Sequence, residues 1–231
     1  MAADKDELDD FYDVLRSGIT VESFLEKHAE IFGFMRAQGL TNDYRLGKGR
    51  VKKLRDEITP VARFVRAHAK PEDRVRFALG NTYPDCTLCH QDGRRREVEV
   101  TVAQAQERFR LMTELNEKGT ARGFLGITDD SAWQDFEDRM GCERKAHSTE
   151  EVLRCIQSAI KLCAQNKLRH GGDTLLIEAP METLPVDRWS QLPEQFADNE
   201  QLKALSFSEV YVTGSSGDGS GWAKDICLKI K

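Results

Sequence analysis

Between residues 74 and 102 the sequence alternates apolar and polar side chains with a period of two, which is typical of half-buried strands. The apolar positions of the first and last of these segments are Val75, Phe77 and Leu79, and then Val98, Val100 and Val102. Asp92-Gly93 precedes the last segment and favours a tight hairpin turn, because glycine adopts the positive φ angles that such turns need. The pattern therefore predicts three consecutive antiparallel strands, over residues 74–79, 85–90 and 96–102.

Residues 4–70 are predicted to be mainly helical, because their apolar side chains recur at steps of three and four. Thr20 is a candidate N-cap, and residues 42–49 are interpreted as a loop. A proline interrupts the second half of this region. We therefore expect one helix to end just before another, which begins with Thr59 as its cap and Pro60 at its first position.

The rest of the sequence mixes helices and strands. Helices are expected over residues 103–118, after Thr128-Asp129-Asp130 and from Thr149 onward, and strands over residues 123–127, 173–179, 207–213 and 222–231. There is no internal repeat and no low-complexity linker. We therefore expect an α+β (mixed α/β) fold, with an N-terminal helical segment over residues 1–47 and a core domain with C-terminal strands over residues 48–231.

The net charge gives no reason to expect a nucleic-acid-binding protein, because 34 Lys and Arg stand against 39 Asp and Glu. Any such function must rest on a local basic patch. Residues 36–76 supply one, with twelve Lys or Arg and five acidic residues. A solvated helix face is the commoner cause of such a charge run, and a phosphate-binding surface is the functional alternative.

The apolar content of 39% is ordinary for a globular domain and argues against intrinsic disorder. No apolar run approaches the length of a membrane span, and the acidic N-terminus lacks the basic and then apolar segments of a signal peptide. We therefore expect a cytoplasmic protein with no membrane partner, whose six cysteines are thiols.

One cysteine motif suggests a different chemistry. Cys86-Thr87-Leu88-Cys89-His90 matches the attachment pattern of c-type haem, and Cys142 and His147 are the nearest further zinc ligands. Haem attachment needs an exported compartment, and a zinc site of the common kind needs a second Cys-x-x-Cys pair, which is absent from the sequence. Strand thiols are the preferred interpretation, and a zinc- or redox-regulated protein is an alternative function.

Acidic side chains lie close together on the predicted sheet. Glu97 and Glu99 occupy one face of a strand, where two like charges repel each other, although a solvated edge strand also explains them. A hairpin turn between the last two strands pairs residues whose numbers sum to about 185, which places Asp85 roughly opposite Val100 and within reach of Glu99. Three converging carboxylates form a hard-oxygen site suited to Mg²⁺ or Mn²⁺.

The spacing of these acids resembles the core motif of the PD-(D/E)xK nuclease superfamily: Pro84-Asp85, eleven intervening residues and then Glu97-Val98-Glu99-Val100-Thr101. The restriction-endonuclease-like core of that family is a helix, three antiparallel strands, a helix and a strand, and residues 48–127 are predicted to follow this order. The resemblance covers about a third of the chain. In the family, the aspartate and a second acidic residue hold a metal ion, and a lysine two residues later orients the attacking water.

The resemblance implies roles for individual residues. Asp85 matches the first acid. If Glu99 is the second acid, Thr101 stands at the position of the lysine, and if Glu97 is the second acid, Glu99 stands there. We prefer Glu99, because the triplet Glu-Val-Thr leads directly into the following helix. In either case the motif lysine is absent, although a metal ion by itself lowers the pKa of its bound water.

Other positions complete the implied site. Some family members take a further acid from the first helix, for which Glu57 is the candidate, and place a glutamine at the start of the next helix, here Gln104 or Gln106. The implied metal ligands are Asp85, Glu97, Glu99 and the carbonyl of Val100. The implied catalytic residues are Asp85, Glu97, Glu99, Thr101, Gln104 and Glu57.

These inferences predict a metal-dependent nuclease that hydrolyses phosphodiester bonds, in DNA more than in RNA, with a role in restriction or defence. Basic side chains are expected to hold the phosphates of the substrate strand: Lys48, Arg50, Lys52, Lys53, Arg94, Arg95 and Arg96. The resemblance also allows a homodimer, since many family members cut both strands as dimers. A catalytically silent relative that binds nucleic acid or serves as an assembly subunit is the alternative, because the lysine is missing.

Overall fold

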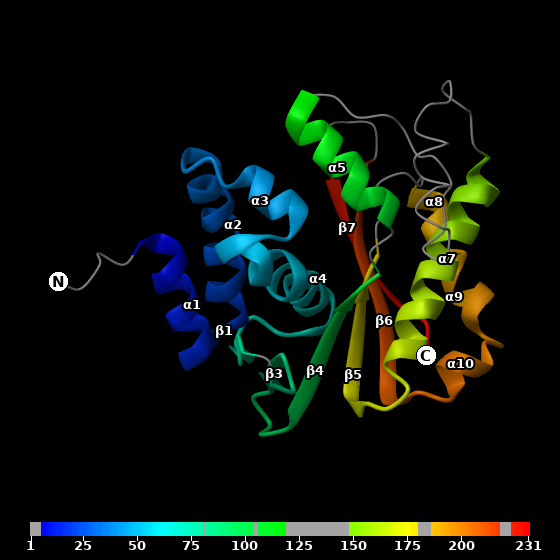
Figure 1. Ribbon diagram of the computed structural model, residues 1–231. Coiled ribbons are helices and arrows are strands. Elements are labelled where there is room, and N and C mark those ends of the chain that lie inside the picture. The colour runs from blue at the N-terminus through cyan, green and yellow to red at the C-terminus, as the bar shows by residue number, and fades with distance from the viewer. Residues whose placement is uncertain (1–5, 81, 104–105, 119–147, 180–185, 218–222) are drawn as a thin grey trace. The chain divides into compact units, whose positions relative to one another are not determined.

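The computed structural model describes residues 6–80, 82–103, 106–118, 148–179, 186–217 and 223–231, which form a mixed α+β fold (Figure 1). The chain divides into two compact units. The first unit comprises Met1–Thr101, Gly172–Leu176 and Phe207–Glu209, and the second comprises Val102–Gly171, Ile177–Ser206 and Val210–Lys231. The N-terminal helical segment, residues 1–47, therefore belongs to the same compact unit as the predicted strands.

The first unit begins with the helices α1 (Glu7–Ser17), α2 (Val21–Ala37), α3 (Thr41–Leu46) and α4 (Thr59–His68). Thr20 caps α2 as predicted, because its Oγ1 accepts a hydrogen bond from the backbone N–H of Ser23 at 3.3 Å. The predicted loop over residues 42–49 is wrong, since α3 covers most of it. This helix is too short to be stable alone, and its Tyr44 ring packs edge-on against Phe32 of α2, with 5.3 Å between ring centroids.

A π-helix, η2 (Leu54–Ile58), follows the short 3₁₀ helix η1 (Gly49–Val51) and runs directly into α4. The expected boundary is confirmed, since η2 ends at Ile58 and α4 begins at Thr59, but Ile58 and Thr59 both keep helical dihedral angles, so the helix is not interrupted and Thr59 is not its cap. Pro60 has no N–H and its ring crowds the preceding turn, and a widened turn accommodates it. In this turn both the backbone N–H and the hydroxyl of Thr59 donate to the carbonyl of Leu54, the hydroxyl at 2.8 Å.

The predicted hairpin strands are present as β2 (Arg74–Phe77), β3 (Cys86–Cys89) and β4 (Arg95–Val102), each antiparallel to the next. A short strand that the sequence did not predict, β1 (Ile19–Thr20), pairs with β2. Gly93 takes a φ of 84° in the predicted turn, and Cys86 pairs with Val98. Paired residue numbers thus sum to one less than expected, so the continued register places Asp85 opposite Glu99.

The register gives the three strands an apolar and a polar face. Phe77, Cys86 and Val98 are aligned across β2, β3 and β4, and all three are buried. The helices cover this face, since Phe24 of α2 lies 5.4 Å from Phe77 between ring centroids. On the opposite face, a second row of aligned residues is formed by Arg76, Thr87 and Glu97. The polar row is the feature that positions the sites described below.

The second unit contains the remaining helices, which are α5 (Gln106–Lys118), α7 (Thr149–Asn166), α8 (Val186–Trp189), α9 (Leu192–Phe196) and α10 (Glu200–Lys203). The strands β5 (Gly171–Glu178), β6 (Ser206–Gly217) and β7 (Ala223–Lys229) match predicted strands, and β6 pairs with β7 antiparallel. Gly172–Leu176 of β5 and Phe207–Glu209 of β6 belong to the first unit. The strand predicted over 123–127, the helix after it, and Gln104 lie outside the described residues.

Candidate active site

Asp85 stands directly before β3 and is fixed to both neighbouring strands. Its carboxylate Oδ2 accepts a hydrogen bond from the backbone N–H of Val100 at 2.8 Å. Its backbone carbonyl accepts one from the N–H of Ala78 at 3.0 Å. The predicted proximity of Asp85 to Val100 is therefore confirmed. The contact is made to the N–H of Val100, whereas the resemblance implied the carbonyl of that residue as a metal ligand.

Glu57 projects from the π-helix η2 and is largely buried, with 14% of its side chain exposed. Its Oε1 accepts a hydrogen bond from the Lys53 ammonium, and in the described chain no group donates to its buried Oε2. Burial above all, together with repulsion from the Asp85 carboxylate, raises the pKa of Glu57 to about 7 against the opposing effect of Lys53. The Asp85 charge therefore lies within electrostatic range of Glu57.

Lys53 was expected to bind nucleic acid, and the structure gives its ammonium two partners within the protein. Besides Glu57, it donates to the carbonyl of Gly80 at 2.8 Å. The ammonium thus connects η2 with the segment that leads into Asp85. Because it supplies a positive charge next to the largely buried Glu57, Lys53 lowers the free energy of holding that carboxylate there.

Glu97 and Glu99 follow the alternation of β4 onto the polar face, together with the half-buried Thr101. Glu97 is exposed, and its Oε2 accepts a hydrogen bond from the hydroxyl of Tyr83 at 3.1 Å. Glu99 is only 8% exposed. Burial, the bond to Glu97 and the charges of the nearby carboxylates raise the pKa of Tyr83 to about 12.

The predicted trio of converging acids is not found among the described residues. Among the described residues, no three His, Cys, Asp or Glu side chains lie close enough to hold a metal ion. Glu57 comes from the helices that cover the apolar face, whereas Glu97 and Glu99 lie on the polar face. Glu57 and Asp85 still fit a magnesium-type ion, because Mg²⁺ ordinarily takes one or two carboxylates and completes its shell with water and phosphate oxygens. The buried Oε2 of Glu57 provides a free lone pair for such an ion.

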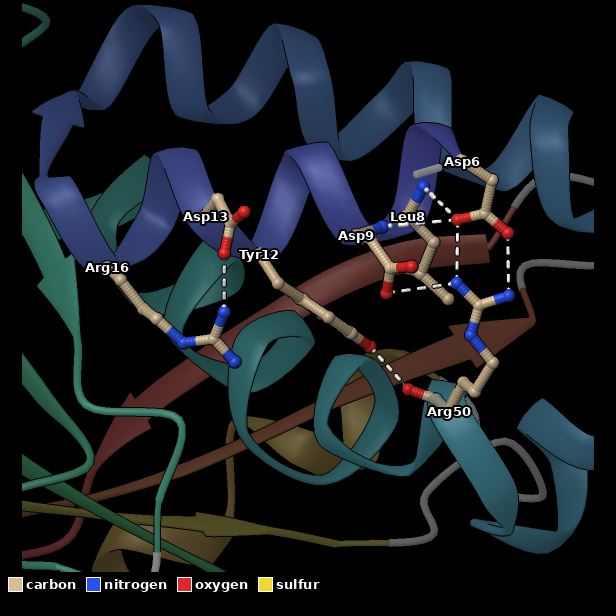
Figure 2. A network of polar contacts seen from close by, with 7 residues as sticks. All are labelled: Asp6, Leu8, Asp9, Tyr12, Asp13, Arg16 and Arg50. Carbon is tan, nitrogen blue, oxygen red and sulfur yellow. Dashed lines mark hydrogen bonds and ion pairs between the residues drawn. The ribbon is translucent and has the colours of Figure 1, made fainter. Parts of the chain in front are cut away.

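Arg50 is tied to the start of α1 (Figure 2). Its guanidinium donates to both carboxylate oxygens of Asp6 at 2.6 Å and lies 3.0 Å from Asp9. These bonds hold the pKa of Asp6 below its ordinary value. The backbone carbonyl of Arg50 also accepts from the hydroxyl of Tyr12 at 2.7 Å. Arg50 therefore joins η1 to α1. These contacts within the protein compete with the phosphate contact predicted for Arg50.

The hairpin arginines also have partners in the protein. Arg94 pairs with Asp92 at 2.7 Å, and Arg96 pairs with Glu209 at 3.2 Å while lying over the ring of Phe64. Arg95, like Lys48 and Lys52, is exposed. Arg94 and Arg96 therefore have acidic partners within the protein that compete with phosphate, although the exposed Arg94–Asp92 pair contributes little stability.

The cysteine motif forms part of the strand core. The Cys86 thiol is buried, which raises its pKa, and Cys89 is half-buried. Nδ1 of His90 lies 2.9 Å from Oδ2 of the buried Asp73, so this carboxylate orients the ring. The other suggested zinc ligands, Cys142 and His147, lie outside the described residues.

Several residues of the site were missed from the sequence. Lys53 was assigned to phosphate, although its spacing of four from Glu57 is the helical spacing that brings a lysine and a glutamate together. Tyr83 immediately precedes the Pro84-Asp85 motif, and this position is the sequence signal that points to it. Asp173 accepts from the backbone N–H of Glu97 at 2.9 Å, and 76 residues separate the two, so no local pattern reveals this contact.

No helix in the described ranges combines the length and apolar character needed to cross a membrane. Comparison with protein-family models, with curated proteins and with solved structures gives no match to this chain.

Proposed function

We propose that the protein is a metal-dependent nuclease that hydrolyses phosphodiester bonds in DNA, built on a restriction-endonuclease-like core. The observation that carries the proposal is the largely buried Glu57 carboxylate, which has an oxygen without a hydrogen bond and is acted on by the charge of the half-buried Asp85. Burying a carboxylate whose oxygen receives no hydrogen bond, within range of a second negative charge, destabilises a fold. Such arrangements concentrate at functional sites, where they serve chemistry.

The order of elements supports the same proposal. The helix η2–α4, the antiparallel strands β2, β3 and β4, and then α5 follow each other along the chain. The aspartate stands at the start of the second of these strands, and Glu97 and Glu99 stand in the third. The strand that would complete the core falls within the residues that the structure leaves undescribed.

Glu57 and Asp85 would hold the Mg²⁺ or Mn²⁺ ion, and water and phosphate oxygens would complete its shell. When bound, such an ion lowers the pKa of a coordinated water and offsets charge that builds up on the phosphate. The protein's own groups prepare this site. The N–H of Val100 fixes the Asp85 carboxylate, and Lys53 holds one oxygen of Glu57.

Lys53 supplies a positive charge near the acidic motif, where the sequence has no lysine at position 101. Its ammonium lies within hydrogen-bonding distance of Glu57 and of the Gly80 carbonyl, so a positive charge is present at the acidic pair although it comes from the helix. A fixed cation beside a reacting phosphate favours the more highly charged transition state. We therefore propose that the missing motif lysine does not abolish catalysis.

The proposal is tested by incubating supercoiled plasmid with the protein and Mg²⁺ or Mn²⁺, and in parallel with excess EDTA. Asp85→Ala is expected to reduce the cleavage rate at least about 100-fold, because ligand removal costs more than the 10- to 100-fold loss typical of outer-shell changes. Glu26→Ala is the matched control, since it removes one exposed carboxylate from α2. Equal cleavage by parent and Asp85→Ala would contradict the proposal.

No cleavage by the parent at high protein concentration, with either ion, would also count against the enzyme. Retained DNA binding in that case would favour the catalytically silent, nucleic-acid-binding alternative. Glu57→Gln and Glu99→Gln, measured in the same assay, show which of the two acids acts with Asp85. The structure favours a larger loss for Glu57→Gln, since the Asp85 charge acts on Glu57.

A further inference from the structure

A cavity of about 340 Å³ opens in the first unit next to the acidic motif. Its lining includes Arg16, Arg76, Tyr83, Pro84 and Thr87, and we call it the arginine hollow. Arg76 and Thr87 belong to the polar row of the sheet, and the third member of that row is Glu97. The hollow therefore lies on the polar face, beside the residue that immediately precedes Asp85.

The two arginines are held so that their charged ends stay available. Nε of Arg76 donates to the backbone carbonyl of Arg16 at 3.0 Å, and its terminal nitrogens have no hydrogen-bond partner among the described residues. Arg16 pairs with Asp13 at 2.7 Å, with 52% and 44% of the two side chains exposed (Figure 2). An exposed pair of this kind contributes little stability, so an anion can replace Asp13 at low cost.

A third arginine adds to the same surface. Arg74 lies two residues before Arg76 on β2, and it donates to the carbonyl of Gly18 at 2.7 Å. The carbonyls of Arg16, in the last turn of α1, and of Gly18, its C-cap, thus anchor two guanidinium groups. Fixed guanidinium groups recognise phosphate well, because their fork of donors matches two phosphate oxygens.

Tyr83 supplies an aromatic surface in the hollow. Its side chain is one of the few large apolar groups left exposed in the described chain, at 45%. The hydroxyl end is fixed by Glu97, and it packs so closely on Gly172 that a Cβ there would lie 1.8 Å away. The ring therefore has a set orientation while much of its surface remains open to solvent.

We propose that the arginine hollow binds one nucleotide of a single-stranded nucleic acid, with the phosphate on Arg16 and Arg76 and the base stacked on Tyr83. The volume lies within the range for small-ligand sites, about 300 to 1,000 Å³. Stacking on an aromatic ring requires a base whose face is free, which a single strand offers and a duplex interior does not. Pro84 lines the hollow and Asp85 follows it, so a strand held here leads to the carboxylates.

This inference rests on the proposed function for its choice of nucleic acid as ligand, and binding without metal separates the two. Fluorescence anisotropy in EDTA measures the affinity for a labelled oligodeoxythymidine, the matching oligoribonucleotide and a blunt DNA duplex. Arg76→Ala and Tyr83→Ala are each expected to weaken single-strand binding about tenfold. Tyr83→Phe keeps the ring and is expected to retain most of the affinity.

Arg36→Ala is the matched control, since it removes an exposed arginine from the last turn of α2 without touching the hollow. Thermal unfolding confirms that each variant is folded, and Arg76→Gln replaces Arg76→Ala if the latter is unstable. Unchanged affinity of the Arg76 and Tyr83 variants, absence of single-strand binding, or tighter binding of the duplex would each overturn the inference. Single-strand binding that depends on Arg76, in a protein that never cleaves, supports the hollow and contradicts only the nuclease.

Discussion

Single residues in the first unit carry charge states that follow from their surroundings. His28 is buried in α2, and burial, followed by repulsion from Arg66 and Arg63, lowers its pKa to about 3. Its Nε2 lies 3.1 Å from the hydroxyl of Thr59. Because that hydroxyl donates its proton to the Leu54 carbonyl, it accepts from His28, so His28 is neutral with the proton on Nε2.

We expect His28 to make the fold sensitive to acid. A histidine with a depressed pKa in the folded state stabilises the fold above its unfolded pKa of 6.5, and this stability is lost as the pH falls toward 3. Between pH 7 and pH 5 the loss is about 2 kcal/mol. Urea unfolding of the parent and of His28→Gln at both pH values measures it, since Gln keeps a donor to Thr59 without titrating.

The difference between the two proteins isolates His28 from the other titrating groups. Glu57, whose pKa is raised, contributes a change of opposite sign in the same pH range, and it is present in both proteins. A free-energy difference between parent and variant that does not change with pH would contradict the assignment.

At the scale of elements, local sequence signals control where helices and strands begin. Ser148 and Glu151 form a complete capping box at the start of α7, with the Ser148 Oγ accepting from the Glu151 N–H at 3.2 Å. The reciprocal bond joins the Ser148 N–H to the Glu151 carboxylate at 2.9 Å. Turn chemistry acts in the same way at Gly93, whose positive φ closes the β3–β4 hairpin.

Ser148→Ala is expected to lower the free energy of unfolding by about 1 kcal/mol. The Glu151 N–H loses its side-chain acceptor, and the reciprocal bond from the N–H of residue 148 to the Glu151 carboxylate loses the support of the capping box. Chemical denaturation monitored by circular dichroism measures the change. Ser158→Ala, within the same helix, is a suitable control because the substitution leaves the N-terminus of α7 intact. A loss at position 148 no greater than at position 158 would show that the cap contributes nothing.

At the scale of the whole molecule, some basic side chains pair with acidic residues of the same chain and others are left exposed to bind a ligand. Arg50, Lys53, Arg94 and Arg96 all bond to acidic residues of the same chain. Both arginines of the hollow are exposed, and for Arg76 only Nε is bonded within the described chain. The excess of seven basic residues over acidic ones in residues 36–76 therefore overstates the charge that faces a ligand.

This division predicts a shallow salt dependence of nucleic-acid binding. Seven phosphate contacts to a single strand would give a slope of about −5 for the logarithm of the affinity against that of the salt concentration. Contacts from Arg16, Arg74 and Arg76 alone give a slope of about −2. Titrations of oligodeoxythymidine at several salt concentrations measure the slope, and a value steeper than about −4 would show that the paired residues open to bind phosphate.

The sequence determined the parts of the fold that depend on neighbours along the chain. The alternation of Val98 and Val100 with Glu97 and Glu99, together with the Asp92-Gly93 turn, was sufficient to predict the β3–β4 hairpin and its register to within one residue. The Thr20 cap was also predicted, because its hydrogen bond spans only three residues.

Tertiary structure alone decided how the acids are arranged. The pattern placed Asp85, Glu97 and Glu99 in one predicted site, whereas in the fold the Asp85 charge acts on Glu57 and the Glu97 carboxylate accepts a hydrogen bond from Tyr83. The same is true of the π-turn that carries Glu57 and of the hollow between Arg16 and Arg76. These features depend on side chains that meet across strands and helices, and the free energy of burying a charge is set by those distant neighbours, which no local pattern encodes.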